Sequence, residues 1–475
     1  SLKKMVLKAI LEDTYNLMKV IKRGREVVSG SIAERICDSY KQLSLAEKET
    51  FFNMLVSDHG VAETTKIGIT LDRSNPVESI QRLQNLRHIT QPQFAGLFRV
   101  LGKAQGGVKF MVNMRTDLSK LTGKSTVEAT PAVVPVIDHE LKQLLSVWFS
   151  SGLFHLQRAT WESPSRLLEK VAASEAVHPI LGWQDLKRRV GAYKRCFVFT
   201  HPCLPGEPLV ILHAALLENV ADTMEKIVPA LFEHMPDSVE DPARVKVANF
   251  YSISRPIDGL SGIDLGSNIV RRVMHRLQAE YPKLQHFSSL SPIPGFNNWL
   301  FGQINRHLQH EVFARILDDV RPESSDLLPL FSDETHVKMM QLFDVDNNKD
   351  LYTKLSMTLE SQEWITSPVL VSELKQPLMK LCARYLFALK HRGHALDPIA
   401  NFHLRNGAVM YRLCWQADQS PNGLSQSCGM MVNYRYYPEL TEGFSEKYYF
   451  TKRIPVGEPF ASVISIEPDS LPLDP

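Results

Sequence analysis

The sequence predicts an α+β protein in which an all-α helical bundle, residues 1–152, precedes a mixed α/β domain, residues 153–475. Apolar residues recur at helical spacing as far as about residue 153, with almost no strand-like alternation. After Val190, short apolar runs separated by proline and glycine begin, as expected for strands. A length of 475 residues also exceeds what one ordinary core accommodates.

The N-terminal helices carry no candidate catalytic cluster. Phe94, Leu97, Phe98 and Leu101 repeat every three or four residues, so one face of that helix is apolar. The charged residues between such positions are typical of solvated faces. An assembly domain and a simple scaffold are both compatible with this pattern.

The composition excludes several classes of function. Hydrophobic residues make up 44% and charged residues 22%, and the formal net charge is +2, so no nucleic-acid or membrane partner is indicated. No apolar run is long enough to cross a bilayer. The six cysteines are scattered without a Cys-x-x-Cys pair, which favours a reducing compartment. The last residues are not a peroxisomal address, and we expect a cytoplasmic protein.

A strand, a glycine-bearing loop and a helix follow one another between residues 245 and 281. The strand is predicted at Val245–Ile253, the loop at residues 256–267 and the helix at Asn268–Tyr281. Free backbone N–H groups and the dipole at such a helix start favour a phosphate. The glycines do not have the spacing of a dinucleotide fingerprint, and on spacing alone an ordinary capped helix start is the simpler interpretation.

The stretch Phe-Ser-Ser-Leu-Ser-Pro-Ile-Pro-Gly-Phe, residues 287–296, is stiffened by two prolines. Each proline fixes its own φ and drives the residue before it out of the helical region, so Ser291 and Ile293 should be extended. Such a backbone can hold the Ser291 hydroxyl at one point. A rigid turn that closes a strand explains the same local chemistry.

Histidines give weaker signals. His391 and His394 have no further ligands of fitting pattern, so we expect no metal and interpret them as caps of a helix predicted at Pro377–Lys390, whose proline suits its first turn. His403 stands between two apolar residues, where a lone histidine is more often structural than catalytic.

Several segments taken together resemble the malonyl-CoA decarboxylase family. Residues 288–296 and residues 401–408, Asn-Phe-His-Leu-Arg-Asn-Gly-Ala, look like two of its signature segments. Shorter matches stand in the family's order at residues 175–179, 187–191, 250–254 and 433–436, with a looser match at residues 148–152. The resemblance implies a GNAT-type acyl-CoA fold for the C-terminal domain, and a helical region that supports a homo-oligomer, a tetramer or a dimer.

The resemblance also implies an activity and a site. Malonyl-CoA would be converted to acetyl-CoA and CO₂, with Ser291 and His403 as the acid–base pair. Asp264, where the family usually has glutamate, and Tyr436 are weaker candidates for orienting His403 or binding substrate. The loop would hold the CoA pyrophosphate. The substrate-binding residues would be Ser261, Gly262, Ile263, Asp264, Leu265, Gly266, Ser267, Ser291 and His403.

The implied reaction requires no metal and no organic cofactor, because the thioester carbonyl is itself the electron sink. Loss of CO₂ leaves an enolate, which needs donors for its oxyanion and an acid for its carbon. His403 would supply that proton, with Ser291 orienting the carboxylate or relaying the proton. An acyl-CoA-dependent acetyltransferase on the same fold would not need Ser291, and a non-catalytic acyl-CoA sensor would use Ser291 and His403 only structurally.

Overall fold

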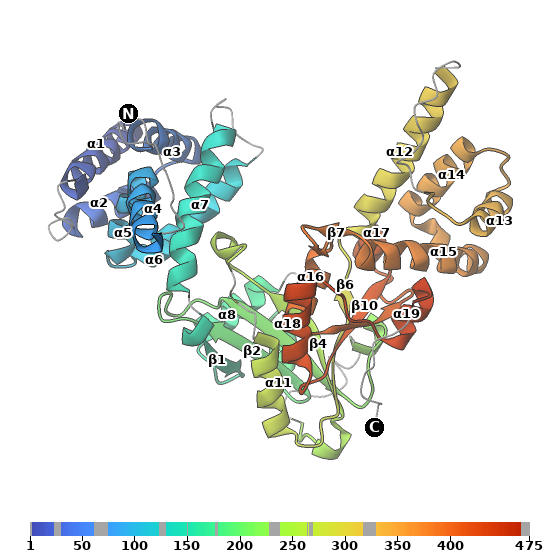
Figure 1. Ribbon diagram of the computed structural model, residues 1–475. Helices are drawn as coiled ribbons and strands as arrows, with labels where there is room; N and C mark the ends of the chain where they lie inside the picture. Colours follow the sequence, from blue (N-terminus) through green and yellow to red (C-terminus); the bar gives the residue numbers. More distant parts are fainter. Residues whose placement is uncertain are drawn as a thin grey trace. The chain divides into compact units, whose positions relative to one another are not determined.

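The computed structural model describes residues 2–22, 30–60, 75–122, 130–149, 151–175, 179–227, 238–263, 265, 269–316 and 329–466. The chain forms two compact units, and Figure 1 labels many of their elements. Unit 1 comprises Ser1–His155, Phe199–Val210 and Arg255–Leu265, and unit 2 comprises Leu156–Val198, Ile211–Ser254 and Gly266–Pro475. Among the described residues, no helix is long and apolar enough to cross a membrane.

The described N-terminal part of unit 1 is helical, as predicted. Its helices are α1 Leu2–Lys22, α2 Gly30–Lys41, α3 Leu45–His59, α4 Pro76–Thr90, α5 Phe94–Lys103, α6 Gly107–Leu121 and α7 Thr130–Trp148. A capping box between Ser44 and Glu47 starts α3. Tyr40 packs edge-on against Phe51 and Phe110, with ring centroids 5.7 and 5.2 Å apart, so aromatic contacts join α2 to α3 and α6.

Unit 2 is organised around a mixed sheet with the strand order β1-β2-β3-β4-β5-β10-β6, and β9 pairs with β10. The strands are β1 His155–Ala159, β2 Lys194–Thr200, β3 Val210–Leu217, β4 Val247–Ser254, β5 His286–Ser289, β6 Ser291–Pro292, β9 Val409–Cys414 and β10 Met431–Tyr436. β4 runs parallel to β5 and antiparallel to β3, and β10 runs antiparallel to β5, β6 and β9. The predicted fold class, a helical region followed by a mixed α/β domain, is confirmed.

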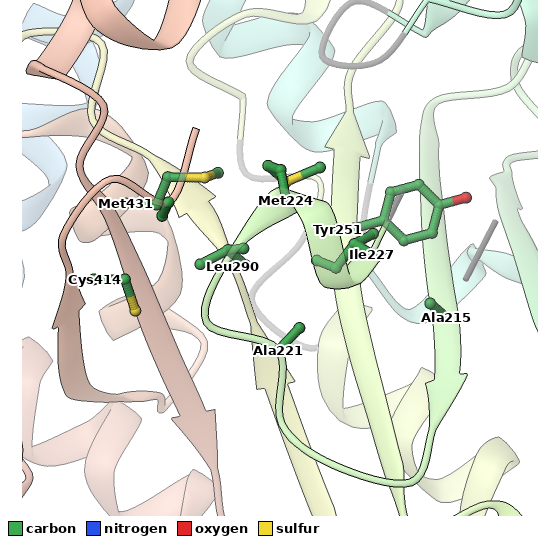
Figure 2. Packing of buried hydrophobic residues seen from close by; sticks show 9 residues of the cluster. Ala215, Ala221, Met224, Ile227, Tyr251, Leu290, Cys414 and Met431 are labelled. Atoms are coloured by element: carbon green, nitrogen blue, oxygen red, sulfur yellow. The ribbon is translucent and has the colours of Figure 1, made fainter. Parts of the chain in front are cut away.

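Helices of unit 2 accompany this sheet. They are α8 Ser165–Ser174, α9 Trp183–Arg189, α11 Ile269–Glu280, α12 Phe296–Ile316, α13 Asp333–Phe343, α14 Asn348–Ser361, α15 Pro368–Phe387, α16 Pro398–Arg405, α17 Pro421–Ser427, α18 Thr441–Thr451 and α19 Glu458–Ile464. Leu168 of α8 and Leu186 of α9 share one buried cluster with Val198 of β2. A second cluster joins Tyr251 of β4 to Met431 of β10 (Figure 2). The first cluster therefore packs against β1, β2 and β3, and the second against β3, β4, β9 and β10.

Two predictions about the region after residue 366 are wrong. Helix α15 begins at Pro368, with Ser367 as its cap, and Pro377 lies inside it instead of in its first turn. His391 and His394 do not cap this helix. They face each other in a two-stranded hairpin, β7 Lys390–His391 and β8 His394–Ala395, because Arg392 and Gly393 adopt positive φ values and turn the chain.

Candidate active site

Two serines occupy the passage from β5 to β6. β10 pairs with both strands, placing Tyr436 opposite Phe287 and Val432 opposite Ser291. Ser289 and Ser291 are buried. Pro292 and the following residues keep this stretch out of a helix, so the extended conformation predicted for Ser291 is that of a paired strand.

His403 is carried by α16, a short helix with a strongly defined start. The Asp397 carboxylate accepts hydrogen bonds from the N–H groups of Ile399 and Ala400, at 3.0 and 2.8 Å, and Pro398 occupies the first turn. The imidazole of His403 stacks on Tyr434 of β10, with centroids 4.3 Å apart and planes inclined by 14°. The cap fixes the helix and the stacking fixes the ring.

A continuous chain of hydrogen bonds joins these side chains. Ser289 Oγ lies 2.9 Å from Ser291 Oγ, and Ser291 Oγ lies 2.8 Å from His403 Nε2. On the other side of the ring, His403 Nδ1 lies 2.7 Å from the Tyr436 hydroxyl. If Tyr436 donates to Nδ1, Nε2–H donates to Ser291; in the other tautomer both bonds reverse. The arrangement can therefore pass a proton in either direction.

Burial sets the protonation states of the side chains in this hydrogen-bonded series. It lowers the pKa of His403 to about 3, so the imidazole is neutral at physiological pH, and it raises the pKa of Tyr436 far above its ordinary value, so the phenol keeps its proton. Both groups are fully desolvated, and their hydrogen bonds are correspondingly strong. An anion placed beside Ser291 would meet no fixed charge on these residues.

The structure brings together three of the four predicted catalytic residues, Ser291, His403 and Tyr436. The fourth, Asp264, lies outside the described residues, as do Gly266 and Ser267 of the predicted CoA loop. Sequence reasoning missed Ser289, Tyr434 and Asp397 as neighbours of this site. The repeated serines at positions 288, 289 and 291 and the tyrosines flanking Arg435 were the signals available.

The described part of the loop, Ser261, Gly262, Ile263 and Leu265, belongs to unit 1. It follows the short helix η4, Asp258–Leu260. Ile263 and Leu265 are buried, so only their backbones can serve a ligand. The expected free N–H groups are not found at three positions. The N–H of Ser261 donates to the Asp258 carbonyl at 2.9 Å, that of Ile263 to the Leu260 carbonyl at 3.1 Å, and that of Leu265 to the Ile263 carbonyl at 2.9 Å.

No group of three or more histidine, cysteine or acidic side chains that could hold a metal ion is found within the described ranges. In particular, His394 contacts the Lys452 ammonium at 2.9 Å, an arrangement that disfavours a cation. The hydroxyl of Ser291 and the imidazole of His403, in hydrogen-bond contact at 2.8 Å, can transfer a proton between them.

Comparison with known proteins identifies the family. A family model described as the malonyl-CoA decarboxylase C-terminal domain matches residues 152–469, and one described as the N-terminal domain matches residues 69–149. The chain belongs to the malonyl-CoA decarboxylase family. The predicted family is therefore confirmed over both parts of the chain.

Curated relatives and solved structures agree with this assignment. Malonyl-CoA decarboxylase, mitochondrial, of Mus musculus is 42% identical over 86% of this chain and 79% of the relative; that of Rattus norvegicus is 41% identical over the same shares. The crystal structure of malonyl-CoA decarboxylase from Agrobacterium vitis has a TM-score of 0.75 at 28% identity, covering 96% of this chain and 99% of that one. That from Rhodopseudomonas palustris has a TM-score of 0.74 at 27% identity, covering 97% and 99%.

Proposed function

We propose that Ser291 and His403 are the acid–base pair of this decarboxylase, with Tyr436 fixing the imidazole. The activity itself, decarboxylation of malonyl-CoA, follows from family membership and from two relatives that are 42% and 41% identical to this chain over 86% of its length. The observation that carries the proposal is the buried chain Ser289–Ser291–His403–Tyr436, with contacts of 2.9, 2.8 and 2.7 Å. A sensor would have no use for such a relay.

The proposed reaction begins with cleavage of the bond between the carboxylate and the α-carbon. The bonding electron pair moves into the thioester to give an enolate, and CO₂ leaves. The α-carbon then takes a proton from the Ser291 hydroxyl, while Ser291 takes one from His403 Nε2. Acetyl-CoA results, with one proton consumed for each CO₂ released, and the thioester serves as electron sink without an organic cofactor.

His403 must gain a proton before it can act as this acid. In the free protein, burial keeps the imidazole neutral. The malonyl carboxylate, placed beside Ser291, brings a negative charge within a few ångströms of the ring and raises the pKa of His403. Substrate binding and proton uptake are therefore coupled, so the acid is formed only when substrate is present.

The CoA part of the substrate is assigned to the loop after β4. The described residues Ser261, Gly262, Ile263 and Leu265 supply a glycine turn with φ of +71° at Gly262 and a buried anchor. The assignments of Asp264, Gly266 and Ser267 to the same function stay predictions.

Substitution of the two central residues tests the proposal. Ser291→Ala and His403→Asn should each lower kcat for release of acetyl-CoA from malonyl-CoA by about 100-fold or more, the usual contribution of a general acid. Ser288→Ala is the matched control: Ser288 is also buried on the same segment, but among the described residues its hydroxyl donates only to the Ser289 carbonyl, at 3.3 Å. Undiminished turnover by the Ser291→Ala and His403→Asn variants would remove these residues from the mechanism.

Assembly and location are proposed from the sequence. A homo-oligomer, tetramer or dimer, is expected, and sedimentation equilibrium of the purified protein checks it. The scattered cysteines, without a Cys-x-x-Cys pair, are the sequence feature behind the predicted reducing compartment. Three curated relatives are named mitochondrial, and fractionation of the native cells decides between that compartment and the predicted cytoplasm.

A further inference from the structure

Arg115 links the helices of unit 1 to the loop assigned to CoA. Its guanidinium is buried and donates to the backbone carbonyls of Gly259, at 2.9 Å, and Ser261, at 2.6 Å. The remaining nitrogens contact the Asp138 carboxylate of α7 at 2.7 and 3.4 Å. The planar guanidinium of Arg115 on α6 thus binds both α7 and the loop. A lysine ammonium cannot reproduce this geometry.

The loop backbone lies directly against α6. A Cβ added to Gly259 would be 2.0 Å from the carbonyl oxygen of Val112 and 2.8 Å from Thr116 Oγ1. No side chain fits in that space, so glycine permits the approach. Together with the Arg115 contacts, this packing fixes the turn at residues 261–263 from the helical side.

Lys142 of α7 brings a positive charge to the same turn. Its Nζ lies 3.1 Å from the position that a Cβ on Gly262 would take. Within the described part of the chain, this ammonium has neither an ion pair nor a hydrogen-bond partner. Because the N–H groups of Ser261, Ile263 and Leu265 already donate within the loop, an anion held here needs a charge from elsewhere.

We propose that the helical region contributes to substrate binding: Lys142 is a direct cationic ligand of the CoA diphosphate, and Arg115 is a positioning residue for the loop beside it. The inference rests on the proposed role of the loop and deepens it. The neighbouring acid, Asp138, is neutralised by Arg115 and does not repel the phosphates.

The experiment compares ligands with and without the nucleotide. For wild type, Lys142→Gln and Arg115→Gln, kcat and KM are measured with malonyl-CoA and with malonyl-pantetheine, which lacks the phosphates. Calorimetry gives Kd for CoA and for 3′-dephospho-CoA. Lys120→Gln removes an exposed lysine of α6 as the matched control.

Lys142→Gln should raise KM for malonyl-CoA and both calorimetric Kd values about tenfold, because one charge-assisted contact is lost. It should leave kcat for malonyl-CoA, and both kcat and KM for malonyl-pantetheine, unchanged. Arg115→Gln should likewise raise KM for malonyl-CoA without changing kcat. Arg115→Lys should bring KM only part of the way back to the wild-type value. An equal rise in KM with malonyl-pantetheine, or an unchanged Kd of Lys142→Gln for CoA, would overturn the inference. An effect on CoA but not on 3′-dephospho-CoA would overturn the diphosphate assignment.

The two proposals fail in different ways. If wild type released no CO₂ from malonyl-CoA, the proposed function would fall, while calorimetry with CoA would still test Lys142. If Lys142→Gln bound CoA as tightly as wild type while turnover persisted, only the inference about the helical region would fall. Lys142→Gln is a change at a partly exposed position, so the test does not depend on the folding of an Arg115 variant.

Discussion

His403 makes the stability of the protein depend on pH. Its pKa is about 3 in the folded state, because of burial, against an ordinary value near 6.5. Above pH 6.5 both folded and unfolded states hold a neutral imidazole. Between pH 6.5 and 3 the unfolded state binds a proton that the folded state does not, so the free energy of unfolding falls as the pH falls.

We expect this term to reach about 2 kcal/mol at pH 5. Urea unfolding of wild type and His403→Gln at pH 7.5 and pH 5.0 measures it. Wild type should lose about that much more stability than the variant on acidification, whereas the exposed His391→Gln should behave as wild type does. An identical pH dependence for wild type and His403→Gln would mean that the imidazole is charged in the folded protein.

Residue chemistry alone left His403 ambiguous, and only motif resemblance made it a catalytic candidate. The reason is physical: a lone histidine between apolar residues looks the same in sequence whether its partners are a serine and a tyrosine or a packed core. Its hydrogen-bond partners Ser291 and Tyr436 lie on β6 and β10, far along the chain. Sheet register, which no local pattern reveals, brings them together.

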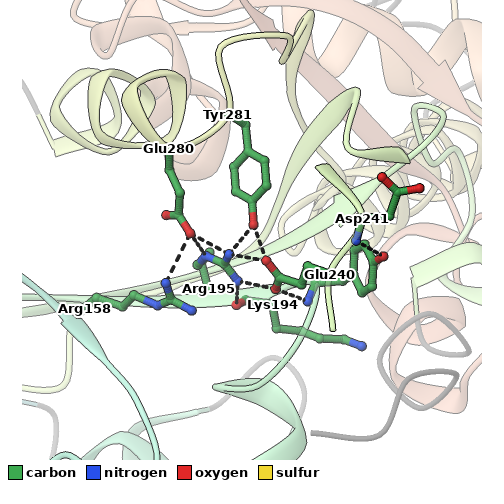
Figure 3. A network of polar contacts seen from close by, with 8 residues as sticks. Arg158, Lys194, Arg195, Glu240, Asp241, Glu280 and Tyr281 are labelled. Carbon is green, nitrogen blue, oxygen red and sulfur yellow. Dashed lines mark hydrogen bonds and ion pairs between the residues drawn. The ribbon is translucent and has the colours of Figure 1, made fainter. Parts of the chain in front are cut away.

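At the scale of elements, the join between β2 and α11 depends on one buried cation. Arg195 donates to Glu240 at 2.8 and 2.7 Å and to Glu280 at 3.0 and 2.6 Å, and it also contacts Tyr281 (Figure 3). Burial by itself would raise the pKa of Glu240, but hydrogen bonds from Arg195 and Tyr281 lower it to about 2. The charges therefore persist at every physiological pH.

Arg195→Met should destabilise the protein by about 3 kcal/mol, because two partly buried carboxylates lose their partner. Arg244→Met is the matched control. Its ion pair with Glu218 is about half exposed on both sides and screened by water, so a much smaller loss of stability is expected. Urea unfolding measures both differences. If both variants lost an equal and small amount of unfolding free energy, water would have replaced Arg195 in the network.

Elements were predicted best where the pattern is local. The helix expected at Asn268–Tyr281 is described from Ile269 to Glu280, and the strand expected at Val245–Ile253 is described from Val247 to Ser254. The start of α15 was placed nine residues too late, because Pro377 matches a first-turn signal that Pro368 also carries. Tertiary packing tolerates the inner proline. The signal that separates the two positions is the preceding residue: Ser367, a favoured N-cap, stands before Pro368, whereas Gln376 stands before Pro377.

For the whole molecule, the boundary predicted between residues 152 and 153 stays a prediction. The compact units do not follow chain order: unit 1 takes in Phe199–Val210 and Arg255–Leu265 from beyond that boundary. Contacts between distant segments, such as Arg115 with Gly259, decide this membership. Composition along the chain cannot report them, since each partner looks ordinary in its own neighbourhood.

Because residues 255–265 belong to unit 1, we expect their backbone amides to exchange cooperatively with the helices of that unit. Residues 255–263 follow β4 directly but are held by α6 through Arg115, so their amides should open with α6 and not with β4. Native-state hydrogen exchange at rising urea, read by mass spectrometry of peptides from α6, the loop and β4, measures the three opening free energies. The loop and α6 should share one value. In Arg115→Gln the loop should exchange at lower free energy while α6 changes less, because two carbonyl acceptors lose their donor. A loop that instead exchanges together with β4 in both proteins would show that its stability comes from the strand, and that α6 is only its neighbour.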